Sequence, residues 1–128
     1  MTNLTLSLIF SVVSAQHHIP PGLLSALCFV ESRHNIDAIH HDDGRSESLG
    51  VCQIKYNTAK WLGYKGDIVD LMIPEINALY AAKYLEYQLK RYDYDIARAA
   101  TAYNRGNAKG LTRSSYSDKV LQRWEEGR

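Results

Sequence analysis

The strongest constraint on the fold is a long stretch, from Pro74 to about Tyr92, in which apolar residues recur every three or four positions. The apolar residues that share one side of a helix drawn through this stretch are Ile76, Leu79, Ala82, Leu85 and Leu89. Pro74 suits the first turn of a helix, because the N–H that proline lacks has no partner there. The pattern predicts one long helix that buries a single side, with a core built against it.

Proline, glycine and aspartate divide most of the remaining chain into shorter helices. Asp93 or Asp95 can cap one helix that Gly106 ends. The other shorter helices that we expect span residues 22–33, 57–61 and 117–124. Only the stretch from Ile36 to Gln53 lacks a helical period, and we expect it to be a loop with at most a small hairpin. The sequence therefore predicts a mainly α fold in which this loop forms a small lobe.

The apolar N-terminal segment from Leu4 to Ala15 admits two interpretations. Residues that share one face of a helix there are Leu4, Leu8, Val12 and Ala15. Val13-Ser14-Ala15 would serve as a signal-peptide cleavage site, but the first basic residue is Arg33, so the usual positive segment is missing. We expect a first core helix rather than a signal peptide. The segment is also too short to span a bilayer.

The composition is that of a folded chain, with 45% hydrophobic and 23% charged residues. A length of 128 residues fits a single domain over residues 1–128. The net charge is +1, and the C-terminal excess of basic residues comes without a recognisable nucleic-acid-binding module, so no nucleic acid is expected as a partner. Cys28 and Cys52 both lie in apolar runs, and we expect two buried free thiols rather than a disulfide.

Glu31 stands where the apolar stretch Leu23–Val30 ends. A glutamate in such a place is a solvated carboxylate, a member of a buried ion pair, or a functional acid. An acid that donates a proton near neutral pH needs partial desolvation, which raises its pKa from about 4.3 toward about 6. Leu27, Phe29 or Val30 would supply that desolvation. From composition alone the solvated carboxylate is expected, because most glutamates are exposed, so the functional role of Glu31 depends on the motifs that follow.

Three short motifs follow one another along the chain: Glu31-Ser32, Gly50-Val51-Cys52-Gln53-Ile54 and Ala102-Tyr103-Asn104. In this order and at these spacings they resemble the soluble-type lytic transglycosylases, which are lysozyme-like enzymes that cleave peptidoglycan. The resemblance covers roughly residues 8–110, and Tyr116–Trp124 is similar to the Tyr-x-x-x-Val helix that follows in the family. Cys52 departs from the pattern, because the family usually carries methionine at that position.

The resemblance implies a lysozyme-like helical domain with a small loop or hairpin lobe that lines a glycan cleft. It also implies cleavage of the β-1,4 bond between N-acetylmuramic acid (MurNAc) and N-acetylglucosamine (GlcNAc). Glu31 would protonate the glycosidic oxygen and then, as a base, take the proton of the C6 hydroxyl, which attacks C1 and leaves a 1,6-anhydro product. One carboxylate suffices when the N-acetyl group of the substrate supports the developing charge, an exception to the usual pair of carboxylates.

The candidate substrate-binding residues are Ser32, Ser48, Gln53, Tyr103 and Asn104. Ser32 either bonds back to its own helix or faces the cleft, and Ser48 is the alternative polar neighbour for the substrate. Gln53 can donate and accept toward a sugar or toward Glu31. Tyr103 would offer its hydroxyl to the acid and its ring to a sugar, and Asn104 would offer its amide.

Neither a metal nor an organic cofactor is expected. The residues that come closest to a ligand cluster are His40, His41, Asp42 and Asp43. No second cluster at fixed spacing accompanies them, so we interpret them as part of a solvated loop.

Two other functions stay open at the level of sequence. A hydrolytic muramidase on the same fold would need a second carboxylate, for which the loop offers Asp42, Asp43 and Glu47. A non-catalytic module would hold glycan within a machine that crosses the cell envelope, such as a phage tail, a secretion system or a pilus. In each case we expect peptidoglycan strands as the partner, the periplasm or cell envelope as the location, and no stable insertion into a membrane. Delivery as a component of a virion or secretion machine fits these expectations.

Overall fold

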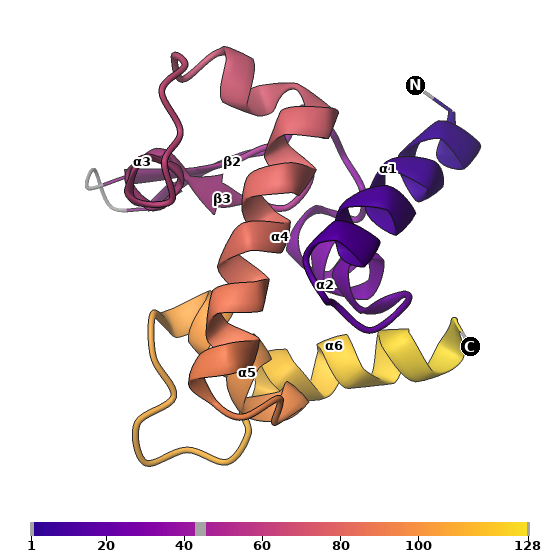
Figure 1. The fold of residues 1–128 in the computed structure, drawn as a ribbon, viewed down its shortest axis with the longest axis vertical. Coiled ribbons are helices and arrows are strands. Elements are labelled where there is room, and N and C mark those ends of the chain that lie inside the picture. The colour runs from indigo at the N-terminus through magenta and orange to yellow at the C-terminus, as the bar shows by residue number, and fades with distance from the viewer. Residues whose placement is uncertain (1, 43–45, 128) are drawn as a thin grey trace.

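The computed structural model describes residues 2–42 and 46–127, and it is mainly helical with one small sheet (Figure 1). The helices are α1 (Asn3–Gln16), α2 (Leu23–Ser32), α3 (Tyr56–Trp61), α4 (Pro74–Arg91), α5 (Ile96–Arg105) and α6 (Ser115–Glu126). The strands are β1 (Ile39–Asp42), β2 (Ser46–Leu49) and β3 (Ile54–Lys55), and a 3-10 turn spans Asp70–Met72. The predicted fold class, mainly α with a small hairpin lobe, is confirmed.

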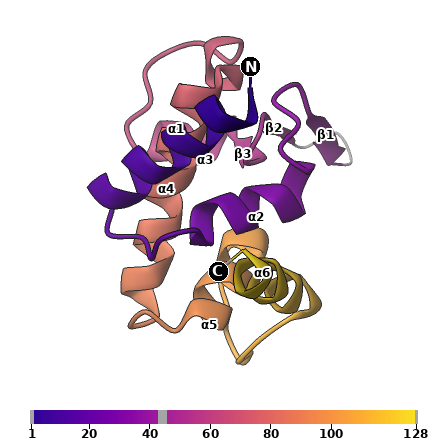
Figure 2. The ribbon, with the colours of Figure 1, turned by 90° about the vertical axis from the view of Figure 1, so that its right-hand side faces the viewer.

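Helix α4 lies at the centre of the molecule, and Pro74 stands in its first turn as expected. In Figures 1 and 2 it runs from the sheet and α3 at the top toward α5 at the bottom. Its fully buried hydrophobic residues are Ala78, Ala81, Ala82, Leu85 and Leu89. The three alanines let neighbouring helices come close, and α1, α2 and α5 all pack against α4.

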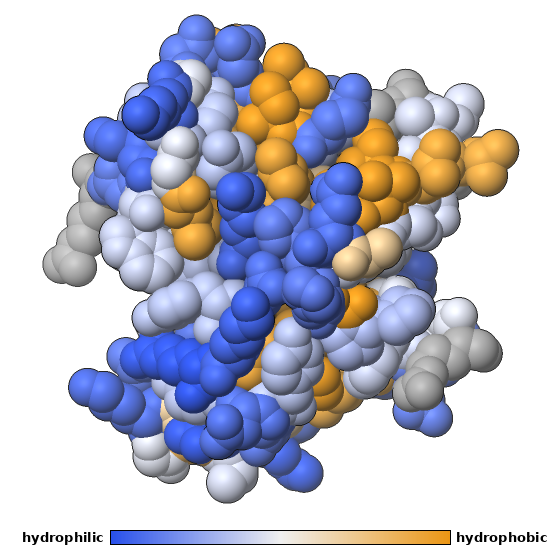
Figure 3. Space-filling model, in the orientation of Figure 1, coloured by the Kyte–Doolittle hydropathy of each residue, from blue (hydrophilic) through white to orange (hydrophobic). Residues whose placement is uncertain are grey.

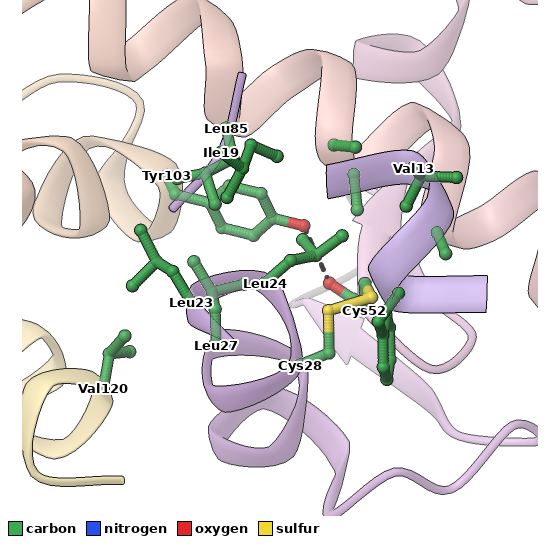
Figure 4. Packing of buried hydrophobic residues seen from close by; sticks show 14 of the residues in the cluster. Val13, Ile19, Leu23, Leu24, Leu27, Cys28, Cys52, Leu85, Tyr103 and Val120 are labelled. Atoms are coloured by element: carbon green, nitrogen blue, oxygen red, sulfur yellow. Dashed lines mark hydrogen bonds between the residues drawn. A yellow bond between two sulfur atoms is a disulfide. The ribbon is translucent and has the colours of Figure 1, made fainter. Parts of the chain in front are cut away.

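Two hydrophobic clusters meet at α4. The larger cluster joins α1, α2, α4, α5 and α6, and Figure 4 shows Leu27 and Leu85 within it. The smaller cluster lies between the sheet, α3 and the 3-10 turn, and it contains Leu49 and Ile54. Tyr84 of α4 packs against both clusters. The molecule therefore consists of two lobes that share α4, with Tyr84 at their junction.

The sheet is antiparallel, with the strand order β1-β2-β3. Ile39 pairs with Leu49 across β1 and β2, and Leu49 pairs with Ile54 across β2 and β3. The hairpin expected within residues 36–53 is confirmed, and β3 adds a third strand directly after that stretch.

Helix α1 packs into the larger cluster, but the face predicted to be buried is wrong. Leu4, Leu8 and Val12 have exposed fractions of 82%, 64% and 47%, and Ala15 is exposed as well. The hydrophobic residues of α1 that are buried are Leu6, Phe10 and Val13. Apolar residues occur on every side of this helix, so the period alone does not identify the side that packs.

Cys28 and Cys52 form a disulfide, so the prediction of two free thiols is wrong. The residues are 24 positions apart, but α2 packs beside the loop that follows β2 and brings their Cα atoms to 4.3 Å. Both are fully buried, as their apolar neighbours in the sequence suggested. The disulfide, drawn in yellow in Figure 4, fastens the helix that carries Glu31 to the loop that carries Gln53.

Polar residues define the ends of the later helices. Asp95 caps α5 by accepting a bond from the backbone N–H of Arg98, and Gly106 follows α5 with a φ of 94°. Helix α6 begins two residues before the expected Ser117, because Ser114 and Ser117 form a reciprocal capping box. No helix among the described residues has both the length and the apolar character needed to cross a membrane.

Candidate active site

Glu31 lies in the last turn of α2, where its side chain is half-buried. Its Oε2 accepts a hydrogen bond of 2.6 Å from the hydroxyl of Tyr116 on α6. The helix stops directly after Glu31-Ser32, because Arg33 adopts a left-handed backbone with a φ of 58°. The packing of α2 against α6 therefore places the carboxylate and its donor together.

Burial raises the pKa of Glu31 from 4.5 to about 7, and the hydrogen bond from Tyr116 opposes this rise by a smaller amount. Near pH 7 the carboxylic acid and the carboxylate are therefore both populated. Such a group can donate a proton and later accept one at the same pH. The rise in pKa expected from desolvation is confirmed.

Tyr116 is not among the residues predicted for the site, although the sequence places it at the start of the Tyr-x-x-x-Val segment. Burial, and then the nearby Glu31 carboxylate, raises the pKa of Tyr116 well above its usual value of 10. Its phenol therefore stays protonated and donates to Glu31. The two residues are 85 positions apart, so only the tertiary packing of their helices reveals the pair.

Tyr103 does not donate to Glu31, so the prediction that its hydroxyl serves the acid is wrong. The hydroxyl donates instead to the backbone carbonyl of Cys52 at 2.9 Å, the dashed line in Figure 4. Tyr103 is buried in the larger cluster, and this carbonyl is the partner that satisfies its polar tip there. Its ring packs against Tyr84 with a centroid distance of 5.1 Å.

Glu31 opens onto a pocket of about 230 Å³ that is built from both lobes. In Figure 3 the outline of the molecule narrows at the left, between the lobe of α3 and the lobe of α5. The predicted site residues that line the pocket are Glu31, Ser48, Gln53, Tyr103 and Asn104. The fold thus gathers five of the six predicted residues, and their roles toward a substrate stay predictions.

Ser32 is the predicted residue that does not line the pocket. Its hydroxyl donates to the backbone carbonyl of Val51 at 2.7 Å and accepts a bond from the backbone N–H of Asn35 at 3.1 Å. The carbonyl of Cys28, in its own helix, lies farther away at 3.3 Å. Ser32 therefore connects the end of α2 to the loop of Gln53, a contact that neither of its two expected roles included, and its bond back to its own helix is the longer one.

The same loop is held from the other side by Asn77, a fully buried residue of α4. Asn77 accepts a bond from the backbone N–H of Cys52 at 2.9 Å and donates to two backbone carbonyls at 2.8 and 2.9 Å. Gly50 has a φ of 77°, and a Cβ atom there would lie 2.4 Å from Asn77 Nδ2. Glycine is therefore required where the loop crosses α4.

Gln53 directs its amide nitrogen to the backbone, where Nε2 donates to the carbonyls of Ala38 at 3.1 Å and Gly50 at 2.9 Å. Its own backbone is left-handed, with a φ of 53°. Both N–H groups are used in this way, so the carbonyl oxygen is the atom that Gln53 can offer to a sugar hydroxyl. The sequence suggested that Gln53 could both donate and accept. In the structure its side chain can only accept a hydrogen bond from a sugar.

The pocket also contains residues that sequence reasoning did not assign to it. Lys55, Thr58, Tyr84 and Arg105 line it together with the predicted residues. Tyr84 lies within the regular pattern of α4 and gives no signal for a cleft in the sequence. Arg105 follows Ala-Tyr-Asn directly, and its proximity to that motif was the available signal.

Among the described residues, no group of three or more His, Cys, Asp or Glu side chains is placed to hold a metal ion. His40 and His41 lie on β1, where His41 Nδ1 is 3.5 Å from Glu47 Oε1 and both of those side chains are exposed. Asp43 and the side chain of Asp42 lie outside the described part of the chain.

A comparison with protein families matches residues 9–123 to the transglycosylase SLT domain. The match covers nearly the whole chain and extends past the three motifs to include Tyr116. The corresponding comparisons with curated proteins and with solved structures find no match. The resemblance to the soluble-type lytic transglycosylases is confirmed, and the chain belongs to the transglycosylase SLT domain family.

Proposed function

We propose that the chain is a lytic transglycosylase that cleaves the β-1,4 bond between MurNAc and GlcNAc in peptidoglycan and forms 1,6-anhydro-MurNAc. The observation that carries the proposal is Glu31, a half-buried carboxylate with a pKa of about 7 that lines a pocket between two lobes. The proposed site of action is accordingly the periplasm or cell envelope, where this polymer lies.

In the proposed first step, protonated Glu31 gives its proton to the glycosidic oxygen, and the bond between that oxygen and C1 of MurNAc breaks. The N-acetyl group of MurNAc supports the positive charge that develops at C1. The carboxylate formed on Glu31 keeps the hydrogen bond from Tyr116, which stabilises its negative charge. Glu31 then accepts the proton of the C6 hydroxyl as the oxygen of that group bonds to C1. Glu31 ends protonated, and no water is consumed.

The number of carboxylates in the pocket favours this reaction over hydrolysis. Among the described residues that line the pocket, Glu31 is the only carboxylate. Glu47, considered for a muramidase, is exposed and lies beside His41 on the neighbouring strand. A one-carboxylate reaction needs no second group to position water, and the substrate supplies its own nucleophile.

The test is mass spectrometry of the products of purified peptidoglycan digested by the wild type and by Glu31→Gln. We expect wild-type products that are lighter by one water than hydrolytic products, and no products from Glu31→Gln. The matched variant Asp42→Asn/Asp43→Asn/Glu47→Gln should keep the activity. Hydrated products, or loss of activity in the triple variant, would establish the muramidase instead. Digestion by Glu31→Gln would show that Glu31 is not the catalytic acid.

A further inference from the structure

Two basic side chains line the pocket of Glu31, one from each lobe. Lys55 belongs to β3 in the lobe of the sheet, and Arg105 is the last residue of α5 in the other lobe. Glu31 is the only carboxylate among the described residues that line the pocket, and it is protonated in the form that begins the proposed reaction. In that form the charges of these residues are all positive, so the pocket attracts an anionic group.

The guanidinium of Arg105 is exposed and has no hydrogen-bond, ion-pair or aromatic partner within the part of the chain that the structure describes. The other described arginines each contact a carboxylate, a backbone carbonyl or an aromatic ring, and they are Arg33, Arg91, Arg98, Arg113 and Arg123. Burial and the bond from Tyr116 account for the pKa of Glu31, and Arg105 does not lower it. Arg105 is therefore not paired with the catalytic acid, and its guanidinium is available to a ligand.

The backbone on both sides of Arg105 is held in place. Its neighbours Asn104 and Gly106 both line the pocket. Gly106 ends α5 with a φ of 94°, and its carbonyl accepts a bond of 3.0 Å from Arg91 Nη1 of α4. The end of α5 is thus fastened to α4, and Arg105 stands at a fixed place beside Glu31.

The sugar MurNAc differs from GlcNAc by a lactyl ether on O3, which ends in a carboxyl group. In a strand without peptides this group is a free carboxylate. In a strand with peptides it is joined to a stem peptide that carries carboxylates of its own. Either substituent brings negative charge, whereas a polymer of GlcNAc alone is neutral. Arginine suits such a group, because its planar guanidinium can donate two parallel hydrogen bonds to one carboxylate.

We propose that Arg105 is a specificity-determining residue that binds a carboxylate on the O3 substituent of MurNAc, so that the pocket prefers MurNAc-containing strands to neutral glycans. Arg105 donates to this carboxylate, and Lys55 adds positive charge from the opposite lobe. The carboxylate takes no part in the bond that breaks, so its binding selects the strand and leaves the chemistry to Glu31. This role rests on the function proposed above, because it concerns the same pocket and the same polymer.

The test is a calorimetric titration of the Glu31→Gln protein with three tetrasaccharides. Two alternate GlcNAc and MurNAc, one without peptides and one with stem peptides, and the third is the neutral tetramer of GlcNAc. We expect a MurNAc glycan to bind about tenfold tighter than the neutral one, equivalent to about 1.4 kcal/mol. Adding Arg105→Gln should abolish this preference and leave the affinity for the neutral glycan within about twofold. Arg105→Lys keeps the charge but not the paired donors, so it should retain a preference of about threefold.

The two MurNAc glycans identify the source of the carboxylate. A preference confined to the glycan without peptides assigns it to the lactyl group, and a preference confined to the glycan with peptides assigns it to the stem peptide. Lys109→Gln is the matched control, because it removes a positive charge from an exposed residue that does not line the pocket, and it should leave the preference unchanged.

Arg105 also lies in the last turn of α5, where its charge interacts favourably with the helix dipole. If that were its only role, Arg105→Gln would weaken the binding of charged and neutral glycans alike, and the proposal would be wrong. It is equally overturned by a preference that survives Arg105→Gln, by equal affinity of the parent for all three glycans, or by the absence of binding to either MurNAc glycan. These outcomes are distinct from failure of the proposed function, because binding is measured without turnover and the function is judged from the digestion products.

Discussion

Glu31 should cost the folded protein stability at neutral pH, and Glu31→Gln should recover it. Burial raises the pKa of Glu31 from 4.5 to about 7, so between these values the folded chain holds a proton that the unfolded chain releases. The pKa of Glu31 is higher in the folded state than in the unfolded state. The contribution of Glu31 to the free energy of unfolding is therefore fully favourable below pH 4.5 and is lost as the pH rises through 7. Since one pKa unit equals about 1.4 kcal/mol, the loss amounts to about 3 kcal/mol at pH 8.

Glutamine keeps the size of the side chain and an acceptor oxygen for Tyr116, but it does not ionise. We therefore expect Glu31→Gln to be more stable than the wild type by about 3 kcal/mol at pH 8, with a melting temperature about 10 °C higher. At pH 4 Glu31 is largely protonated in both states, and the difference should fall below about 0.5 kcal/mol. The gain is thus specific to pH values above the folded pKa.

Urea unfolding followed by circular dichroism at pH 4 and pH 8 measures this difference. The matched control is Glu125→Gln, which changes an exposed glutamate of α6 and should alter the stability by less than about 0.5 kcal/mol at both pH values. A gain of equal size at both pH values would show that glutamine packs better and that ionisation is not the cause. No gain at pH 8 would refute the idea that burial sets the pKa of Glu31.

Three further predictions concern the groups around Glu31. Tyr116→Phe removes the hydrogen-bond donor to the Glu31 carboxylate, so the pKa of Glu31 should rise. The upper limb of the pH profile of kcat/KM, where Glu31 loses its proton, should move up by about one pH unit. The rate should fall about tenfold in peptidoglycan lysis assays. Gly50→Ala should cost about 2 kcal/mol more in the wild type than in an Asn77→Ala background, because the added Cβ meets Asn77; a double-mutant cycle by urea unfolding measures this, and equal costs would contradict the contact. Replacing Cys28 and Cys52 by alanine opens a crosslink across 24 residues and should cost about 3 kcal/mol in urea unfolding, whereas an unchanged midpoint would mean that the disulfide adds nothing.

The helices whose ends carry clear chemical signals could be predicted from the sequence. Pro74 opens α4, Asp95 caps α5 and Gly106 follows it, and each acts through the backbone of its own helix. Such signals are local and need no knowledge of the rest of the fold. The buried face of α1 could not be predicted in this way, because Leu4 and Leu6 are equally apolar and only packing against α4 distinguishes them.

Some residues of the site could be predicted from the sequence, whereas others depend on the tertiary fold. Glu31 could be identified from the order and spacing of the three motifs, because its neighbours in the sequence also fit a solvated carboxylate. The burial that raises its pKa comes from the tertiary fold. The residue that donates a hydrogen bond to Glu31 could not be identified in this way, because the sequence offers the phenol hydroxyls of both Tyr103 and Tyr116 as donors. The fold decides between them, since the hydroxyl of Tyr103 reaches Cys52 and that of Tyr116 reaches Glu31.

The position and the ionisation of Glu31 are therefore controlled by different parts of the molecule. Ser32 and the Cys28–Cys52 disulfide tie α2 to the loop of Gln53, and Tyr103 holds that loop in turn. None of these contacts donates to the carboxylate, whereas Tyr116 of α6 does. Variants that disturb the loop should then weaken the protein and its hold on the glycan, and they should lower the pKa of Glu31 only as far as they expose its carboxylate to water. Variants that remove the hydrogen bond from α6 should raise the pKa of Glu31 further, since that bond opposes the larger effect of burial.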